Sequence, residues 1–357
     1  MIISRTPFRV SFFGGGTDYP VWFREHGGAV LATTINKYCY INLRYLPPFF
    51  EHKSRIVWSR IESVMSVDEI QHPAVREALR FMDISQGIEL HHDGDLPART
   101  GLGSSSAFTV GLLNALYGLT GRMPSKLQLA REAIHIEQER LKEHVGSQDQ
   151  VVAAFGGLNR IQFFPDGRFD VTPLILSESR AVQLQDHLML FFTGFSRNAS
   201  DIAAEQIKAT ARKGAQLKRM REMVDEAIAQ LQGSGDVAAF GRLLDDSWQL
   251  KRGLTEKIST ARIDEMYEAA QRAGAIGGKL LGAGGGGFLL LVAKPEEQER
   301  VKEALDGLLH VPFRFETGGS RIIFYEAVGS PSAADTPSPE RIVSARSPVR
   351  SLAGERS

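Results

Sequence analysis

Residues 97–119 read PARTGLGSSSAFTVGLLNALYGL, a glycine-rich loop that passes directly into an apolar segment. We expect a helix whose first turn carries Ser104, Ser105 and Ser106. A helix N-terminus presents unpaired backbone N–H groups and the positive end of the helix dipole, and glycines let an anion approach closely. The run Gly101-Leu102-Gly103-Ser104-Ser105-Ser106 is therefore a candidate phosphate-binding loop. No Gly-Lys-Ser/Thr follows, so it is not a Walker A loop; a turn with a serine N-cap is the simpler alternative.

Three carboxylates downstream are candidates for metal and proton chemistry. Glu137 and Glu139 lie late in a helix expected over 124–142, and Asp149 lies in the first turn of the next helix, which Ser147 can cap. A chain reversal between the two helices would bring these carboxylates beside the serine-rich turn. Magnesium-dependent phosphoryl transfer needs one carboxylate on the metal and another near the acceptor hydroxyl. The competing interpretation is that the glutamates are solvated and that Asp149 only complements the helix dipole.

Two further glycine clusters flank this central region. Gly14-Gly15-Gly16 precedes Thr17 and Asp18, whose carboxylate can accept hydrogen bonds from two sugar hydroxyls, and Arg9 supplies a nearby cation. An ordinary turn is the alternative here. The second cluster, KLLGAGGGGF at 279–288, contains a Gly-x-Gly-x-x-Gly match, but a helix precedes it and a strand follows. A dinucleotide-binding fingerprint needs the reverse order, which leaves either a functional loop or a flexible hinge.

Composition excludes several classes of protein. With 357 residues, 43% hydrophobic and 24% charged, the chain suits a soluble protein of two domains. Lysine plus arginine and aspartate plus glutamate both total 42, so no net charge attracts nucleic acid or a membrane. The single cysteine, Cys39, fits a reducing compartment, and neither a signal peptide nor a long apolar run is visible. We therefore expect a cytoplasmic protein, with no nucleic acid and no membrane among its partners.

The residue pattern changes character after about Arg180. Before it, we expect strands and short helices, including strands over 2–5, 8–13, 29–46 and 87–92 and a hairpin over 161–174. After it, we expect a strand at 188–193, then long helices over 199–231, 237–250 and 263–273, the glycine loop over 277–287 and a last strand over 320–326. We assign residues 1–185 and 186–329 to two domains, and residues 330–357, rich in Ser, Pro, Ala and Arg, to a disordered tail.

The three glycine motifs, in this order and with this spacing, resemble those of the GHMP kinases (galactokinase, homoserine kinase, mevalonate kinase and phosphomevalonate kinase). PFRVSFFGGGTDYP at 7–20 is similar to the first motif of that family, PARTGLGSSSA at 97–107 to its phosphate loop, and KLLGAGGGGF at 279–288 to its third motif. The likeness covers about residues 3–327. It implies an α+β, two-domain GHMP kinase-like fold, with an N-terminal half like ribosomal protein S5 domain 2, a ferredoxin-like C-terminal half and an active site between them.

The resemblance also implies a role for each matched residue. The loop from Gly101 to Ser106 would wrap the phosphates of ATP, and Ser105 and Glu137 would hold Mg²⁺, with Glu139 as a rival for Glu137. Asp149 would be the catalytic base, and Arg9 a cation that stabilises the developing charge. Residues implied at the substrate are Gly15, Gly16, Thr17, Asp18, Gly284 and Gly285, the last two in a close-packed loop.

Four fragments look most like one branch of the family, the bacterial D-glycero-D-manno-heptose 7-phosphate kinases. These fragments are GGGTDYP (14–20), GSQDQ (146–150), TGFSR (193–197) and SWQLKRGL (247–254). Galactokinases typically carry Gly-Glu-His-Thr-Asp in the first motif, whereas Gly15 and Gly16 stand at the Glu-His positions here, which speaks against galactose. A phosphorylated substrate needs fixed cations, and Arg197, Lys251 and Arg252 are candidates, unless they are solvated basic residues on exposed helices.

The resemblance therefore implies phosphorylation of the anomeric hydroxyl of heptose 7-phosphate to give the 1,7-bisphosphate, for nucleotide-activated heptose and surface polysaccharide. ATP and Mg²⁺ are the implied cofactors, the sugar phosphate and ATP are the implied partners, and a homodimer is left open. Alternatives are a kinase for an unphosphorylated fucose- or mannose-like sugar or for another heptose phosphate. A sugar-binding regulator without catalysis, and a related decarboxylase, are less favoured because the base, the metal ligands and the sugar-type first motif are all present.

Overall fold

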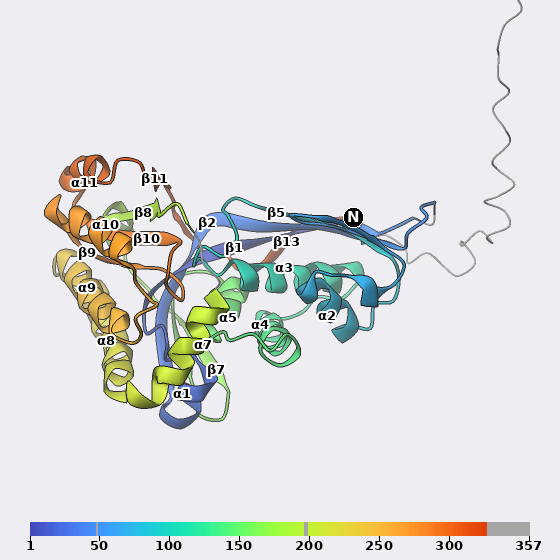
Figure 1. Ribbon diagram of the computed structural model, residues 1–357, viewed down its shortest axis with the longest axis horizontal. Coiled ribbons are helices and arrows are strands. Elements are labelled where there is room, and N and C mark those ends of the chain that lie inside the picture. The colour runs from blue at the N-terminus through green and yellow to red at the C-terminus, as the bar shows by residue number, and fades with distance from the viewer. Residues whose placement is uncertain (48, 196–198, 327–357) are drawn as a thin grey trace, which may run out of the picture.

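The computed structural model describes residues 1–47, 49–195 and 199–326, so the expected tail at 330–357 and Arg197 lie outside the described residues. The fold is α+β and is built on two sheets, one of nine strands and one of four. In Figure 1 the larger sheet extends to the right with helices beneath it, and the smaller sheet lies to the left among the later helices. No helix within the described ranges is both long and apolar enough to cross a membrane.

The larger sheet is organised around two long strands, β1 (Ile2–Phe13) and β2 (Gly28–Tyr45). Its order is β13-β1-β2-β5-β3-β4, with β12 and β6 also paired to β2 and β7 paired to β6. All pairs are antiparallel except β3 with β5. The other strands are β3 (Ser54–Val57), β4 (Ile61–Val64), β5 (Ile88–Gly94), β6 (Asn159–Phe163), β7 (Phe169–Pro173), β12 (Phe315–Glu316) and β13 (Arg321–Tyr325).

Two strands were expected at the start of the chain, and the structure has one continuous strand there. The expected strands over 2–5 and 8–13 form the single strand β1. Pro7 lacks a backbone N–H, but a register shift between Pro7 and Arg9 accommodates this gap in the ladder to β2, so the strand continues. The expected hairpin over 161–174 is confirmed as β6 and β7. This long β1 carries Arg9 and the first glycine cluster from the sheet to the centre of the molecule.

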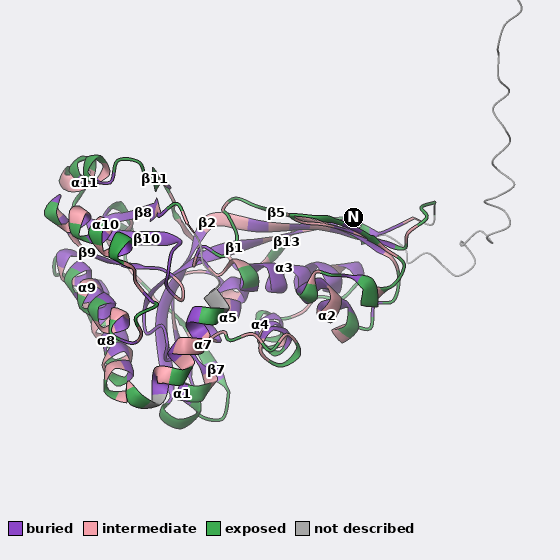
Figure 2. Ribbon diagram, viewed as in Figure 1, coloured by how far each residue is buried: buried purple, intermediate pink, exposed green. Residues whose placement is uncertain are grey.

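Helices cover one face of the larger sheet (Figure 1). The central one is α3 (Ser104–Leu119), in which every residue from Ser106 to Tyr117 is buried. A helix that is apolar on all sides is typical of a protein core, and Figure 2 shows α3 largely in the colour of buried residues. The other helices in the first half of the chain are α1 (Pro20–His26), α2 (Pro73–Phe81), α4 (Lys126–His135), α5 (Gln148–Phe155) and α6 (Glu178–Asp186), with a 3₁₀ turn at Val67–Glu69 and a π-helical segment at Ile136–Arg140.

The smaller sheet is antiparallel, in the order β11-β8-β10-β9. Its strands are β8 (Leu188–Phe192), β9 (Ala275–Leu280), β10 (Phe288–Ala293) and β11 (Leu309–His310). The helices of this half are α7 (Ala199–Ala209), α8 (Gly214–Gln232), α9 (Ala238–Arg252), α10 (Ala261–Arg272) and α11 (Gln298–Ala304), with 3₁₀ turns at Thr210–Arg212 and Pro295–Glu297.

Two expectations for this half are wrong in detail. The helix expected over 199–231 is divided into α7 and α8 by the 3₁₀ turn and by Lys213, which has a non-helical φ of −118° and ψ of 23°. The glycine loop expected over 277–287 begins only after Leu280, because the first residues belong to β9. Gly277 has a packing role there: a Cβ on it would lie 2.0 Å from the carbonyl oxygen of Gly241 in α9.

The chain returns to its first sheet at its end. Strands β12 and β13 pair with β2 and β1, so the last described part of the chain belongs to the larger sheet. The hydrophobic core is also continuous between the sheets: Phe12 and Phe13 of β1 make edge-on contacts with Phe240 of α9, with ring centroids 5.5 and 5.2 Å apart. Because of this shared core, the end of β1 faces α9 and the third glycine motif.

Candidate active site

The glycine-rich loop between β5 and α3 is shaped by left-handed glycines. Gly101 and Gly103 have φ of 84° and 73°, values that favour glycine. Gly103 occupies the N-cap position of α3 without any side-chain cap, so the alternative of a serine N-cap is wrong. The hydroxyl of Ser104 instead accepts a hydrogen bond from the backbone N–H of Arg99, at 3.1 Å. The start of α3 thus keeps the features of an anion site, with glycine backbone and no capping side chain over it.

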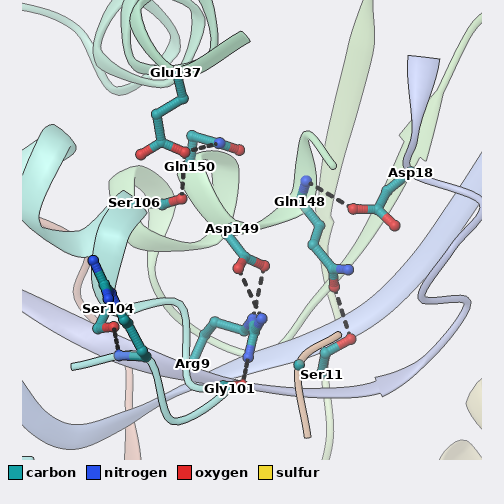
Figure 3. A network of polar contacts seen from close by, with 12 residues as sticks. Arg9, Ser11, Asp18, Gly101, Ser104, Ser106, Glu137, Gln148, Asp149 and Gln150 are labelled. Atoms are coloured by element: carbon teal, nitrogen blue, oxygen red, sulfur yellow. Dashed lines mark hydrogen bonds and ion pairs between the residues drawn. The ribbon is translucent and has the colours of Figure 1, made fainter. Parts of the chain in front are cut away.

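Arg9 and Asp149 form a bidentate ion pair against this loop. Arg9 Nε and Nη2 donate to the two carboxylate oxygens of Asp149 at 2.8 and 2.7 Å, and Nη1 donates to the carbonyl oxygen of Gly101 at 2.5 Å (Figure 3). A Cβ on Gly103 would lie 3.1 Å from Arg9 and 3.4 Å from Asp149. The Arg9 side chain is 5% exposed and that of Asp149 25% exposed. Asp149 therefore lies beside the phosphate loop, as the sequence analysis expected, and Arg9 joins it there without having been expected at that loop.

Glu137 lies in the π-helical segment and is fully buried against α3. Its Oε2 accepts hydrogen bonds from Ser106 Oγ at 2.9 Å and from Gln150 Nε2 at 2.5 Å (Figure 3). Its Oε1 has no hydrogen-bond partner within the described part of the chain. Burial raises the pKa of Glu137 to about 7, and the neighbouring hydroxyls of Thr109 and Ser106 oppose this rise. Segments of π-helix are frequent at functional sites, and here the widened turn directs this carboxylate inward.

The geometry distinguishes the residues that the sequence left as rivals. Glu139 is exposed, whereas Glu137 is buried beside α3. Ser106, rather than Ser105, donates to Glu137, and Ser105 is exposed in the first turn of α3. The sequence missed Ser106 as a partner of the carboxylate and did not consider Gln150, although both stand inside the quoted motifs.

Asp18 is a structural support for the turn that carries Asp149. It is 2% exposed, and its Oδ1 accepts from the N–H of Gly16 at 2.9 Å. Its Oδ2 accepts from the N–H of Gln148 at 3.3 Å, and its backbone oxygen accepts from the N–H of Ser147 at 3.0 Å. Asp18 therefore caps α5 from another part of the chain. The expected cap by Ser147 is wrong, because that side chain makes no cap hydrogen bond.

The remaining first-motif residues are buried in the same turn. Thr17 Oγ1 lies 2.8 Å from the carbonyl oxygen of Gly14 and 3.0 Å from that of Ala29, so its hydroxyl serves the backbone. A Cβ on Gly16 would lie 2.6 Å from Gln206 of α7, whereas one on Gly15 would meet nothing closer than 3.8 Å. Only Gly15 among these residues leaves room next to its backbone.

The two basic residues at the end of α9 face in different directions. Lys251 is 5% exposed, and its Nζ donates to the carbonyl oxygen of Gly282. Burial lowers the pKa of Lys251 to about 8, with Arg9 acting in the same direction and the carboxylates of Asp18 and Asp149 opposing it. Arg252 instead forms a salt bridge with Asp264, at 2.8 Å.

A second buried ammonium group was not predicted as a site residue. Lys279, the first residue of the third glycine motif, is 3% exposed and donates to the carbonyl oxygen of Phe12 at 2.8 Å. Burial, followed by the charges of Lys251 and Arg9, lowers the pKa of Lys279 well below its usual range. In the sequence, only its position as the first residue of KLLGAGGGGF indicated that Lys279 could belong to the site.

The third glycine motif is closely packed, so a flexible hinge does not describe it. Cβ atoms on Gly282 and Gly287 would lie 2.4 Å from Gly101 Cα and 2.2 Å from the carbonyl oxygen of Thr100, both in the phosphate loop. One on Gly284 would lie 2.7 Å from Ile258, and the N–H of Gly285 donates to the Ile258 carbonyl oxygen at 2.9 Å. This loop therefore fixes the phosphate loop from the C-terminal side.

The residues around Glu137 fit a magnesium ion bound together with nucleotide phosphates. Among the described residues no group of three or more histidine, cysteine, aspartate or glutamate side chains could hold a metal. Mg²⁺, however, usually takes only one or two carboxylates and completes its shell with phosphate oxygens and water. Oε1 of Glu137 is buried, and the other oxygen of the same carboxylate accepts from Ser106, so Oε1 is a suitable donor for such an ion.

Comparison with known proteins agrees with this arrangement. The model of the GHMP kinases N-terminal domain matches residues 70–157, and that of the GHMP kinases C-terminal domain matches residues 223–310. The D-glycero-alpha-D-manno-heptose 7-phosphate kinase of Campylobacter jejuni is 29% identical, over 85% of this chain and 93% of that protein. A bifunctional fucokinase/GDP-fucose pyrophosphorylase of Arabidopsis thaliana is 26% identical over 82% of this chain, which spans only 30% of that protein.

Solved structures extend the likeness to the whole fold. A D-glycero-D-manno-heptose 1-phosphate kinase from Bacteroides thetaiotaomicron is 25% identical, with a TM-score of 0.73, and covers 92% of this chain and 100% of that one. A mevalonate kinase with 19% identity and a TM-score of 0.67 shares the fold. The chain matches both family domains, shares the fold and carries three glycine motifs around one ion pair. It therefore belongs to the GHMP kinase family.

Proposed function

We propose that this protein transfers the γ-phosphoryl group of ATP to the anomeric hydroxyl of D-glycero-D-manno-heptose 7-phosphate, giving the 1,7-bisphosphate and ADP. The observation that carries the proposal is the Arg9–Asp149 pair, held in bidentate contact beside a glycine-rich helix N-terminus. A carboxylate that is fixed by a cation and placed next to a phosphate site is the arrangement that hydroxyl phosphorylation requires. We further propose that it works in the cytoplasm, where ATP is available.

The chain's own residues account for each step of the transfer. Asp149 accepts the proton of the sugar hydroxyl while that oxygen forms its bond to the γ-phosphorus, and the bond to the β,γ-bridging oxygen breaks to release ADP. Arg9 orients Asp149 and faces the negative charge that develops on the phosphoryl group. The N–H groups at the start of α3 hold the other phosphates. Mg²⁺, held by Glu137 with Ser105 or Ser106, would neutralise phosphate charge.

An aromatic cluster next to α3 suits the base of ATP. His72 stacks on Phe108, with centroids 4.7 Å apart, and Trp58 and His92 meet this pair edge-on at 4.8 and 4.9 Å. Phe108 lies one turn beyond Ser104, and the other three rings are half-buried. Flat rings of this kind stack on nucleobases, and we propose that adenine binds here.

The identity of the sugar is the finer part of the proposal. The C. jejuni relative is named for heptose 7-phosphate, the B. thetaiotaomicron structure for heptose 1-phosphate, and the A. thaliana relative for fucose. Heptose 7-phosphate is favoured because the C. jejuni relative has the highest sequence identity of the three, 29% against 25% and 26%. A kinase for a free fucose- or mannose-like sugar is the second candidate. The observation that favours it is the salt bridge of Arg252 with Asp264, because it occupies one of the cations expected to bind a substrate phosphate.

The test is ADP release from magnesium-ATP with heptose 7-phosphate, heptose 1-phosphate, free heptose, mannose, fucose and galactose. The wild type and Asp149→Asn are compared, and Arg252→Met serves as a matched control outside the ion pair. We expect turnover on heptose 7-phosphate that falls about 10²–10⁴-fold in Asp149→Asn and is retained in Arg252→Met. Turnover only on free sugars would replace the substrate while keeping the kinase. Tight sugar binding without turnover on any member would replace the kinase by a regulator.

A further inference from the structure

Lys251 is a buried cation whose place in the reaction the sequence did not determine. It projects from the end of α9, and its ammonium group donates to the carbonyl oxygen of Gly282 in the third glycine motif. An ammonium group has three N–H donors, and this is the one hydrogen bond that it makes within the described residues. A buried ammonium with two donors unused is costly unless a ligand supplies the missing acceptors.

The glycine packing locates this ammonium group relative to the reacting residues. Gly282 and Gly101 are in direct contact, since a Cβ on Gly282 would lie 2.4 Å from Gly101 Cα. The carbonyl oxygen of Gly282 accepts from Lys251, and that of Gly101 accepts from Arg9. Lys251 and Arg9 are therefore anchored to two residues that touch, one on each side of the site. The charges of Asp18 and Asp149 also act on the pKa of Lys251, as expected for a group at the same centre.

Basic groups outnumber acidic groups around Lys251. Arg9, Lys251 and Lys279 are basic and interact with one another, whereas Asp18 and Asp149 are the acidic groups that face them. All five residues are at least three-quarters buried, so water stabilises their charged forms poorly. An anion between the two halves of the molecule would supply acceptors to Lys251 and favour its charged form.

We propose that Lys251 binds the phosphoryl group being transferred, the γ-phosphate of ATP, and not the phosphate that the sugar already carries. This inference rests on the proposed function, in which Asp149 receives the proton of the reacting hydroxyl. A sugar 7-phosphate carries its phosphate at the opposite end from its anomeric hydroxyl. A cation anchored beside the Arg9–Asp149 pair therefore faces the reacting end. Lys251 and Arg9 then contact the transferred group from the C-terminal and N-terminal sides.

The neighbouring residue on α9 supplies a matched control. Arg252 is paired with Asp264 and does not contact the centre, so Arg252→Met removes one positive charge from the same helix end without touching the site. Lys251→Met keeps the length of the side chain and removes the ammonium group. Replacing a buried charge with an apolar group of similar volume is commonly tolerated, and thermal unfolding of both variants verifies that they fold.

Two measurements test the inference. The first is the affinity for ADP and for a non-hydrolysable ATP analogue, both with Mg²⁺, which needs no sugar. We expect Lys251→Met to lose about tenfold or more of the preference for the triphosphate, and Arg252→Met to keep it. The second is kcat and KM with heptose 7-phosphate and with free heptose. We expect Lys251→Met to lower kcat about 10²–10³-fold, with the ratio of kcat/KM between the two sugars unchanged.

Other outcomes separate the possible failures. An unchanged triphosphate preference, with kcat/KM reduced for the phosphorylated sugar alone, would overturn the inference and assign Lys251 to the phosphate of the substrate. Wild-type values for both measurements in Lys251→Met would also overturn it and leave the residue a structural role. If the wild type phosphorylates no sugar, the proposed function fails, and the nucleotide affinities still decide whether Lys251 contacts a γ-phosphate.

Discussion

Replacing Glu137 with glutamine is expected to remove a specific dependence of stability on pH. The carboxyl group is fully buried, and its pKa is raised from the ordinary 4.5 to about 7, chiefly by burial. At about 1.4 kcal/mol per unit, this difference of about 2.5 units amounts to about 3 kcal/mol. Between pH 4.5 and 7 the folded protein retains a proton that the unfolded chain has released. The free energy of unfolding therefore falls as the pH rises through this window, and above it the full cost of the buried charge is present.

The glutamine in Glu137→Gln cannot ionise, so the free energy of unfolding of this variant does not fall in this way as the pH rises. We expect its free energy of unfolding, relative to that of the wild type, to increase by about 3 kcal/mol between about pH 4.5 and 7.5. Urea denaturation at several pH values across the window measures the difference, and Glu139→Gln, at an exposed position on the same segment, is the control. Curves for wild type and Glu137→Gln that stay parallel over the whole window would refute the reasoning.

The same variant tests the proposed metal ligand. At about pH 7.5, Mg²⁺ with a non-hydrolysable ATP analogue should stabilise the wild type more than Glu137→Gln, because the ion offsets the charge of the buried carboxylate. Equal stabilisation of both proteins would exclude Glu137 as a ligand. Glu139→Gln should respond like the wild type.

Two other positions give sharp predictions. A Cβ on Gly146 would lie 1.9 Å from the Asp18 carboxylate, so Gly146→Ala should displace the turn before Asp149, the proposed base, and lower kcat at least about tenfold. The control is Gly235→Ala, at a position with open space, which should leave kcat unchanged. Arg180 donates to the carbonyl oxygens of Gln230 and Leu231 in the last turn of α8 and to that of Gly235 just after it. Arg180→Ala should therefore lower the free energy of unfolding by about 2–3 kcal/mol in urea denaturation without changing kcat. A loss of kcat in Gly235→Ala would contradict the account of Gly146. An unchanged free energy of unfolding in Arg180→Ala would contradict the account of Arg180.

Local motifs made part of the site predictable from the sequence. The glycine-rich loop and the apolar helix after it follow from neighbouring residues, and the structure confirms both. The ion pair of Arg9 with Asp149 joins residues 140 positions apart, so neither residue alone indicates it. The resemblance to a known family gave each residue a role in the reaction, but it did not predict that the two would pair.

Other features depend on packing that no local pattern encodes. Asp18 supports the N-terminus of α5 from 130 residues away, which a search for capping residues near Ser147 does not detect. Lys251 and Arg252 are equivalent in sequence, and only the packing of α9 turns the first inward and the second toward Asp264. Strand β13 pairs with β1 across nearly the whole chain, so the division after residue 185 could not anticipate it.

The most direct test of the central claim is the position of the new phosphate in the product. Phosphorus NMR of a reaction containing the protein, magnesium-ATP and heptose 7-phosphate follows both phosphate groups of the sugar at once. The account predicts a new signal coupled to the anomeric proton, appearing together with ADP while the 7-phosphate signal persists, and absent with Asp149→Asn. A new signal coupled to any other sugar proton, or ADP formed at the same rate by Asp149→Asn, would contradict it.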